Sequence, residues 1–269
     1  MNLPEKEFRQ LTEFLKANYG INLSQKKVLI EGRLQNLLQE KGFDNYTDYL
    51  QHVYSDGSKQ EITMLINKLT TNHTFFMREM EHFHYLRDKV LPVLANTVLD
   101  KDLRIWSAGC SSGEEPYTIA MVIADYFGGM KSCWNTKVLA TDISVDVLTA
   151  AEQGIYPAEA LQTLPAAWKL AYFKRIDSEQ YQVCEKLRDE VIYRVFNLMD
   201  GVFPFRRKFH VIFCRNVMIY FDDETKTRLV RKFYDMTEPG GYLLIGHAES
   251  ISKLATEYKY IMPAVYRKG

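Results

Sequence analysis

Apolar residues recur at intervals of three and four positions through the N-terminal third of the chain, and this spacing predicts a run of helices. The first two stripes are each followed by a glycine, Gly20 or Gly42, which is typical of a helix end. Their members are Phe8, Leu11 and Leu15, and then Ile30, Leu34, Leu37 and Leu38. Further helices are expected at 46–53, at 59–69 and from about 79 to 98, with a polar break at 70–74.

The pattern changes after residue 102, where short apolar runs begin to alternate with helical stretches. Strands are expected at 103–108, 138–141, 210–214 and 242–245, and helices at 115–127, 144–153 and 223–236. This alternation predicts an α/β domain with a parallel sheet and helices on both faces. Residues 172–196 interrupt it with short strand-like runs and polar turns, so we expect a small antiparallel β insert at the sheet edge.

Composition narrows the class of protein. The chain has 269 residues, 46% of them hydrophobic, which excludes a disordered chain. Its 34 basic and 34 acidic residues argue against binding nucleic acid through bulk positive charge. Charges near the N-terminus argue against a secretory segment, and no apolar run approaches the ~20 residues that span a bilayer. We therefore expect a cytoplasmic protein without membrane insertion.

Cysteine and histidine spacing gives no sign of a metal centre. The four cysteines are widely separated and form no C-x-x-C pair, which is typical of reduced cytoplasmic thiols. His82 and His84 form an H-x-H pair without a neighbouring cysteine or further histidine, so they are interpreted as solvated or core-edge residues. The sequence predicts no metal site.

The first candidate ligand site follows the strand expected at 103–108. Ligands of open α/β sheets bind beyond the carboxyl ends of strands, and here Gly109 and Gly113 flank a turn of small residues that leads into a helix. Glu114 and Glu115 at the helix start would repel a pyrophosphate but suit a ligand with positive charge, such as S-adenosylmethionine. The alternatives are an ordinary tight turn and acidic residues that complement the helix dipole.

A second candidate lies at the end of the next strand. Asp142 could accept hydrogen bonds from both ribose hydroxyls of a nucleoside, or it could cap the following helix. Together with the glycine turn, Asp142 favours an adenosine-containing cofactor.

Two further segments carry polar groups toward the same edge. Arg215, Asn216 and Tyr220 follow the strand at 210–214, although a simple packed strand exit would also explain them. Residues 70–79 join the helical and α/β parts, and Arg78 could present its fork to a carboxylate. That segment could equally be a linker.

These segments, in this order, closely resemble the chemotaxis receptor methyltransferases of bacteria, the CheR-type enzymes. The matching motifs are T-T-N-x-T-x-F-x-R-E at 70–79, W-S-A-G-C-S-S-G-E-E-P-Y at 106–117, T-D-I at 141–143 and F-C-R-N-V-M-I-Y-F at 213–221. The resemblance implies a helical domain at 1–78 and a Rossmann-like class I methyltransferase domain at 79–269, with the β insert at about 172–196. It also implies methyl transfer from S-adenosyl-L-methionine to glutamate side chains of chemoreceptor cytoplasmic helices, with S-adenosyl-L-homocysteine as the product.

The resemblance also implies roles for particular residues. Arg78 and Tyr220 match positions beside the methyl-transfer centre. Cofactor contacts are expected from Asn72, Thr74, Arg78, Gly109, Glu115, Asp142, Asn197, Leu198, Arg215 and Asn216. Glu115 is preferred to Glu114 for this contact.

Receptor binding is expected from the helical domain. Lys26, Lys27 and Arg33 match the family's substrate-facing cations in type, although a solvated helix face would also explain them. Some members bind a receptor C-terminal peptide through a glycine-containing loop of the β insert, and the corresponding residues here, 176–180, contain no glycine. The partner is expected to be a chemoreceptor rather than nucleic acid, and the protein is expected to be a monomer.

Two other functions remain open from the sequence. One is a methyltransferase with another acceptor, although residues 215–218 are not the [DN]-P-P-[YF] tetrapeptide of enzymes that methylate exocyclic amines of DNA. The other is a non-catalytic signalling module that senses S-adenosylmethionine.

Overall fold

The computed structural model describes residues 2–57, 60–71, 73–252 and 256–269. The chain divides into two compact units, and each is described by itself. The smaller unit comprises Met1–His73, Asn197–Asp200 and Tyr220–Lys226. Two short segments from the second half of the chain therefore pack with the N-terminal helices.

The smaller unit is built on amphipathic helices. Its helices are α1 (Glu5–Tyr19), α2 (Lys27–Lys41), α3 (Tyr46–Ser55) and α4 (Gln60–Leu69). In α1 the residues at helical spacing, Phe8, Leu11 and Leu15, are buried, and the predicted stripe of α2 is buried too. Gly20 ends α1 and Gly42 ends α2, both in the left-handed conformation.

Gly20 also allows the late segments of the chain to approach α1. A Cβ atom there would lie 2.7 Å from the sulfur of Met199 and 3.0 Å from the methyl group of Thr225. Lys16 pairs with Asp222 at 2.7 Å, which joins α1 to the segment Tyr220–Lys226. The glycine is thus required by its φ of +73° and by packing.

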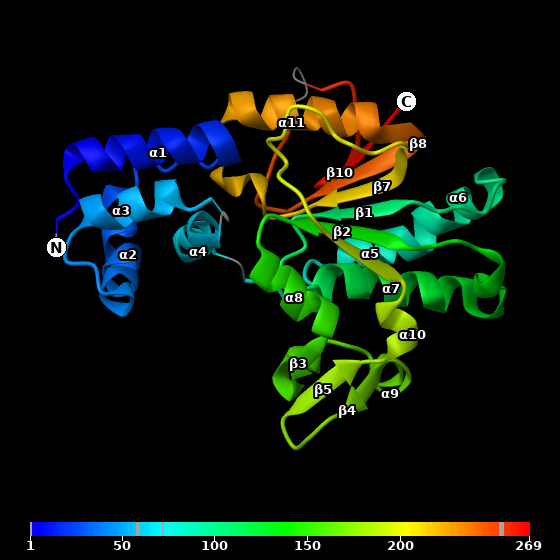
Figure 1. The fold of residues 1–269 in the computed structure, drawn as a ribbon. Coiled ribbons are helices and arrows are strands. Elements are labelled where there is room, and N and C mark those ends of the chain that lie inside the picture. Colours follow the sequence, from blue (N-terminus) through cyan, green and yellow to red (C-terminus); the bar gives the residue numbers. More distant parts are fainter. Residues whose placement is uncertain (1, 58–59, 72, 253–255) are drawn as a thin grey trace. The chain divides into compact units, whose positions relative to one another are not determined.

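The larger unit contains a seven-stranded mixed sheet (Figure 1). Its strands follow one another in the order β6 (Val191–Val195), β2 (Val138–Asp142), β1 (Ile105–Ala108), β7 (Phe209–Cys214), β8 (Thr237–Ile245), β10 (Val265–Arg267) and β9 (Lys259–Met262). The first five are parallel, and β10 is antiparallel to both its neighbours. The predicted parallel sheet is confirmed, with an antiparallel pair added at one edge.

Helices cover both faces of this sheet, with α11 on one face and α5 and α7 on the other (Figure 1). The helical segments are α5 (Glu81–Tyr85), η1 (Leu86–Val90), α6 (Leu91–Thr97), α7 (Glu114–Phe127), η2 (Gly128–Cys133), α8 (Val145–Gln153), η3 (Ala158–Leu161), α9 (Ala166–Tyr172), α10 (Glu185–Arg188), η4 (Met218–Tyr220) and α11 (Asp223–Met236). Alternate residues of a strand face opposite sides of the sheet. On one of these sides, Trp106 of β1 packs among five phenylalanines, namely Phe196, Phe203, Phe205, Phe209 and Phe233.

The small antiparallel sheet differs from the prediction in its strands. It consists of β3 (Ile155–Pro157), β5 (Gln180–Val183) and β4 (Phe173–Arg175). The assignment of 191–196 to this insert is wrong, because β6 pairs in parallel with β2 at the edge of the main sheet. An edge strand has one partner and a partly exposed face, so its short mixed pattern resembles that of an antiparallel strand.

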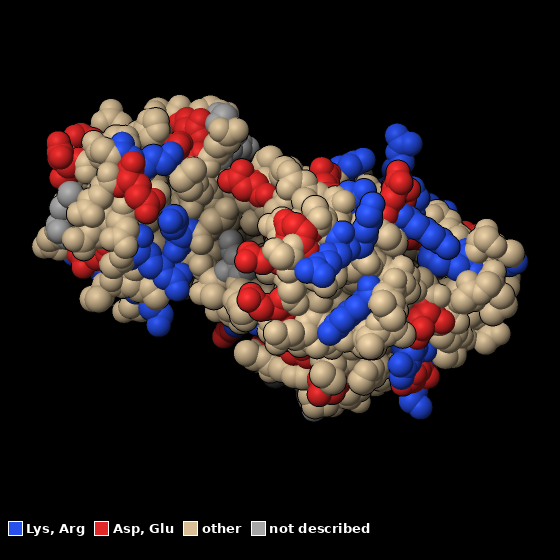
Figure 2. Space-filling view, turned by 90° about the horizontal axis from the view of Figure 1, so that it is seen from below, with Lys and Arg blue, Asp and Glu red and all other residues tan. Residues whose placement is uncertain are grey.

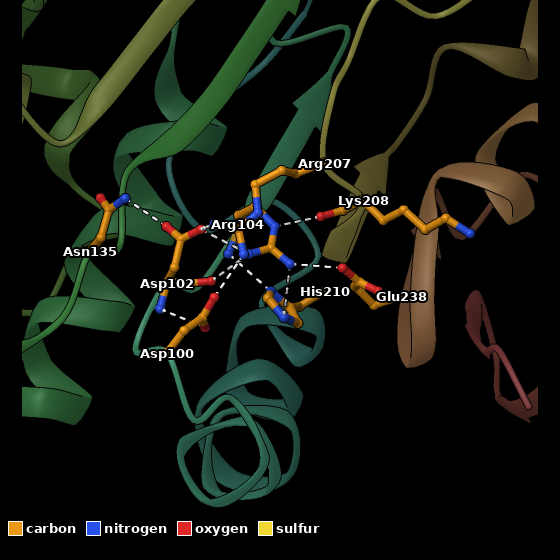
Figure 3. A network of polar contacts seen from close by, with 8 residues as sticks. All are labelled: Asp100, Asp102, Arg104, Asn135, Arg207, Lys208, His210 and Glu238. Carbon is orange, nitrogen blue, oxygen red and sulfur yellow. Dashed lines mark hydrogen bonds and ion pairs between the residues drawn. The ribbon is translucent and has the colours of Figure 1, made fainter.

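A polar network occupies the amino end of the main sheet (Figure 3). Arg104 pairs with Asp102 and with Glu238, both at 2.8 Å, and its backbone N–H donates to Nδ1 of His210 at 3.1 Å. Burial, followed by the nearby Arg104 cation, lowers the pKa of His210 to about 4. His210 is thus neutral in the folded protein, and the network joins β1, β7 and β8 on the side opposite their carboxyl ends.

This neutral histidine predicts acid sensitivity. An unfolded histidine takes up a proton near pH 6.5, so the unfolded state binds more protons between pH 6.5 and about 4, and stability falls as the pH falls through that window. His210→Gln is expected to remove roughly 2 kcal/mol of the stability lost between pH 7 and pH 5. Urea denaturation at the two pH values measures this, with the exposed His84→Gln as control; equal pH dependence in all three proteins would contradict it.

On the face shown in Figure 2, charge is distributed over both units rather than concentrated. In the view of Figure 2, basic and acidic side chains are interspersed on the surface of each unit. This agrees with the equal numbers of basic and acidic residues, 34 of each.

Candidate functional site

The turn between β1 and α7 is a corner that depends on glycine. Gly109 (φ +85°) and Gly113 (φ +96°) both adopt the left-handed conformation, and a side chain at Gly109 would collide with Val217. The N–H groups of Gly109 and Cys110 donate to the carbonyl of Thr141 at 2.8 and 2.9 Å, which fixes the corner against β2. The backbone is therefore held in a compact turn at the carboxyl end of β1, where ligands of such sheets bind.

Asp142 ends β2 beside this corner. Its two carboxylate oxygens accept the N–H of Ser111 at 2.9 Å and the N–H of Ser144 at 3.1 Å. Ser144 is the N-cap of α8, because its hydroxyl accepts the N–H of Val147, so the alternative that Asp142 is the helix cap does not hold. Burial raises the pKa of Asp142, and the backbone donors offset only part of that effect. A carboxylate has about four acceptor positions, which leaves capacity for the hydroxyl groups of a ligand.

Arg215 joins two carboxylates that are far apart in the sequence. Its guanidinium lies 3.2 Å from an oxygen of Glu79 and 3.2 Å from an oxygen of Glu115, and it also donates to the carbonyl of Arg78. It rests against the ring of Phe83, 5.1 Å from the centroid. The Arg215 side chain is only 2% exposed, and the two carboxylates are 14% exposed. Arg215, Glu79 and Glu115 thus form an ion-pair network that is largely buried.

The two carboxylates respond differently to this cation. Burial raises the pKa of Glu115, and Arg215 counteracts only part of the rise. At Glu79 the effect of burial is outweighed by Arg215, a backbone N–H and the amide of Asn216, so the pKa of Glu79 is lowered. Glu115 is therefore protonated more readily than Glu79 as the pH falls.

The adjacent glutamates at the start of α7 have different partners. Glu115 accepts the hydroxyl of Ser107, on β1, at 2.7 Å, in addition to its ion pair with Arg215. Glu114 is buried and accepts the hydroxyl of Ser112 at 2.7 Å. Only Glu115 of this pair faces the strand ends that carry Arg215.

Asn216 is held by an acid that the motifs did not single out. One oxygen of Glu249 accepts the N–H of Asn216 at 2.9 Å and the N–H of Gly246 at 2.6 Å. The Asn216 amide in turn approaches Glu79 at 3.3 Å. Glu79 and Glu249 were both missed as site residues. Two features of the sequence could have indicated them. Glu79 is the last residue of the 70–79 motif, and Glu249 follows β8 by a few positions.

Backbone strain concentrates in this region. Several residues other than glycine adopt the left-handed conformation here, namely Met77 (φ +60°), Glu79 (φ +54°), Ser111 (φ +48°) and Asn216 (φ +60°). Such conformations cost about 1–3 kcal/mol each and persist where the surroundings hold them, typically at ligand sites.

The segment that leads to Arg78 is anchored in the larger unit. The predicted cofactor residue Asn72 lies outside the described residues, and Thr74 is half-buried. The carbonyl of the buried Phe76 accepts the hydroxyl of Thr163 at 2.8 Å. Arg78 is therefore presented from a fixed backbone.

Asn197, Leu198 and Tyr220, which were predicted to lie at the cofactor or the methyl-transfer centre, belong to the smaller unit. The amide of Asn197 donates to the carbonyl of Asn18 at 2.8 Å, and Leu198 is buried. The hydroxyl of Tyr220 accepts the N–H of Thr71 at 2.7 Å. The geometry places these residues within the helical unit, whereas Gly109, Glu115, Asp142, Arg215 and Asn216 lie at the carboxyl ends of the sheet strands.

The cations expected to face substrate have different environments. Lys26 is exposed at the start of α2, and Lys27 pairs with Glu5 at 3.2 Å. Arg33 donates to the carbonyl of Leu69 at 2.7 Å, so it also joins α2 to the end of α4. Lys26 is therefore the cleanest position at which to test receptor binding.

The fold and these residues define the class of protein. A glycine corner, an acid after the second strand and carboxylates rather than cations at the helix start suit an adenosine bearing positive charge better than a pyrophosphate. The donor set therefore fits S-adenosyl-L-methionine, and the class is that of the Rossmann-like methyltransferases.

Comparisons with known proteins agree with this class. The family description "CheR methyltransferase, SAM binding domain" matches residues 72–266, and "CheR methyltransferase, all-alpha domain" matches residues 6–70. The chemotaxis protein methyltransferase of Borreliella burgdorferi is 45% identical over 100% of this chain and 96% of that protein. The chemotaxis protein methyltransferase of Escherichia coli is 35% identical over 98% of this chain and 91% of that protein.

The chain therefore belongs to the CheR methyltransferase family, as the motifs predicted, and is a chemotaxis methyltransferase that uses S-adenosyl-L-methionine. Among the residues that the structure describes, no helix has the length and apolar character required to cross a membrane.

Proposed function

We propose that this protein transfers the methyl group of S-adenosyl-L-methionine to glutamate side chains on cytoplasmic helices of chemoreceptors and forms γ-methyl esters. The observation that supports this best is the match of both parts of the chain, helical and α/β, to chemotaxis methyltransferases over nearly their full length. The protein acts as a cytoplasmic monomer in this proposal.

The cofactor supplies an electrophilic methyl group, so the protein needs no metal or general base for this reaction. A glutamate side chain has an ordinary pKa of about 4.3 and is already ionised at neutral pH. The protein's own task is to align the acceptor carboxylate and to exclude water from the line of attack.

The proposed cofactor contacts divide by chemistry. Asp142 accepts ribose hydroxyls with the acceptor capacity that Ser111 and Ser144 leave, and the corner at Gly109 admits the adenosine. Glu115 provides negative charge for the positive end of the cofactor, and Arg215 keeps Glu115 from being an unpaired buried acid. Asn216 contributes its amide from the rigid position that Glu249 holds.

The remaining proposed cofactor contacts come from other segments of the chain. Thr74 and Asn72 precede the anchored segment, and Asn197 and Leu198 belong to the smaller unit. Arg78 orients the acceptor carboxylate with its planar fork, and Tyr220 positions the acceptor by a hydrogen bond.

One experiment tests the function. The protein is incubated with methyl-labelled cofactor and a receptor cytoplasmic fragment, and the label is then treated with base. Base-labile label on the fragment is expected, because carboxyl methyl esters hydrolyse readily. Label on nucleic acid instead, or cofactor binding without transfer to the fragment, would overturn the proposal.

A charge reversal tests receptor binding by α2. Lys26→Glu is expected to raise KM for the receptor fragment about five- to tenfold at low salt, since an exposed pair contributes ~1 kcal/mol. The effect should shrink in high salt, because screening weakens exposed charges, and cofactor affinity should be unchanged. Lys6→Glu, at an exposed position on α1, is the control. Equal KM values for both variants and the wild type would instead favour a solvated helix face.

A further inference from the structure

His82 is a fully buried histidine whose ring nitrogens form no hydrogen bond with the part of the chain that the structure describes. It lies on α5 with 0% of its surface exposed, and neither nitrogen has a hydrogen-bond partner among the described residues. A neutral imidazole carries one donor and one acceptor, and leaving either unsatisfied in an interior costs about 1–3 kcal/mol. The ring therefore has unused binding capacity at the edge of the site.

Two other ligand-type side chains converge on this ring. Nδ1 of His82 lies 3.6 Å from an oxygen of Glu79, and the ring of His247 meets that of His82 edge to face at 4.8 Å between centroids. One ligand atom from each of Glu79, His82 and His247 lies within 4.8 Å of the others. Ligand atoms of a tetrahedral zinc ion, with bonds of about 2.0–2.1 Å, lie roughly 3.3–3.4 Å apart. Metal binding would therefore require the exposed His247 to bring its ligand atom closer to the other two.

We propose that Glu79, His82 and His247 bind a divalent transition-metal ion, preferentially Zn²⁺, through one carboxylate and two imidazoles. Two histidines and one glutamate form a known zinc donor set, with the fourth position open to water. The H-x-H pair at His82 and His84 gave no such indication, because the partner of His82 is His247, 165 positions later in the chain (247 − 82).

The site would couple to the cofactor through Glu79. The same carboxylate pairs with Arg215 at 3.2 Å and accepts the amide of Asn216 at 3.3 Å. A bound ion competes with Arg215 for Glu79, and leaves Arg215 with Glu115 alone among its carboxylate partners. The metal is therefore expected to weaken cofactor binding, an effect that rests on the proposed roles of Arg215 and Asn216, whereas metal binding itself rests on the geometry.

Cobalt provides a direct readout of metal binding in the full-length protein. Titration with Co²⁺ is expected to produce visible absorption of a low-coordinate ion with nitrogen and oxygen ligands, which Zn²⁺ then displaces. His247→Ala should weaken binding at least ~100-fold, since even loss of an outer-shell partner costs 10–100-fold. His84→Ala, an exposed histidine near the same helix turn, should bind like the wild type. Equal affinity in His247→Ala, or absorption typical of cobalt bound to thiolate, would overturn the proposal.

A second measurement tests the coupling. S-adenosyl-L-homocysteine is titrated calorimetrically into the protein with and without one equivalent of Zn²⁺. Zinc should weaken its binding roughly tenfold in the wild type and His84→Ala, and should have no such effect in His247→Ala. Unchanged affinity in the wild type would overturn the coupling. Neither readout depends on methyl transfer, so failure of the proposed function would be distinguishable from failure of this site.

Discussion

Replacement of Arg78 by alanine is expected to lower kcat with the receptor fragment by roughly 10²–10³-fold, the cost of removing one oriented donor from a reaction centre. Its backbone lies between two residues in the left-handed conformation, Met77 and Glu79, and Arg215 donates to its carbonyl. The direction of the side chain is therefore set by surroundings that alanine leaves in place. The variant should fold normally and lose alignment of the acceptor carboxylate.

Two further variants separate charge from geometry. Arg78→Lys keeps the charge but lacks the planar fork, so its kcat should lie between those of Arg78→Ala and the wild type. Tyr220→Phe removes one hydroxyl and should cost about tenfold, near 1.4 kcal/mol. Steady-state rates at saturating cofactor, with cofactor affinity from calorimetry, provide the measurements. An Arg78→Ala enzyme with unchanged turnover and unchanged cofactor affinity would show that Arg78 does not act at this centre.

Arg215→Ala is expected to destabilise the protein by about 3–5 kcal/mol, the usual cost of breaking a buried ion pair from one side. The side chain is 2% exposed and pairs with both Glu79 and Glu115, so its removal takes from each acid the cation at ion-pair distance. Urea denaturation at pH 7 measures the loss. Arg87→Ala removes an exposed pair with Asp88 and should cost less than about 1 kcal/mol.

The pH dependence of that loss provides a second check. Arg215 lowers the pKa of both acids, so its loss raises the folded-state pKa of Glu79 and Glu115 relative to the wild type, and the folded variant takes up protons more readily as the pH falls. The deficit of Arg215→Ala relative to the wild type should therefore shrink between pH 7 and pH 5. A deficit that is small at pH 7, or that grows toward pH 5, would show that Arg215 does not neutralise these carboxylates.

Local patterns predicted most of the elements. Helices α1 and α2 follow from apolar stripes and terminal glycines, and β1, β2 and β7 follow from short apolar runs before polar turns. These signals involve residues within a few positions of one another, so they can be recognised without knowledge of the fold. The placement of β6 did not follow, because strand partners are chosen by tertiary packing.

The sequence predicted which motifs contribute to the candidate site, but it did not predict which side chains contact one another there. Arg215 and Asp142 stood out because strand ends meet at one edge of a parallel sheet. The acids that hold the site, Glu79 and Glu249, carry no local signal of their roles, since each acts on Asn216 from more than 30 positions away.

The sequence by itself determined the helical and α/β parts, the parallel sheet, the family and the cofactor, because each depends on short motifs and regular spacing. The tertiary structure alone decided that Glu79 and Glu115 share Arg215, that Asn197–Asp200 and Tyr220–Lys226 pack with the N-terminal helices, and that His82 meets His247. These contacts join residues far apart in the chain, and burial then sets their charge. The contacts and the charges both depend on which surfaces the folded chain removes from water, and no local sequence pattern predicts that.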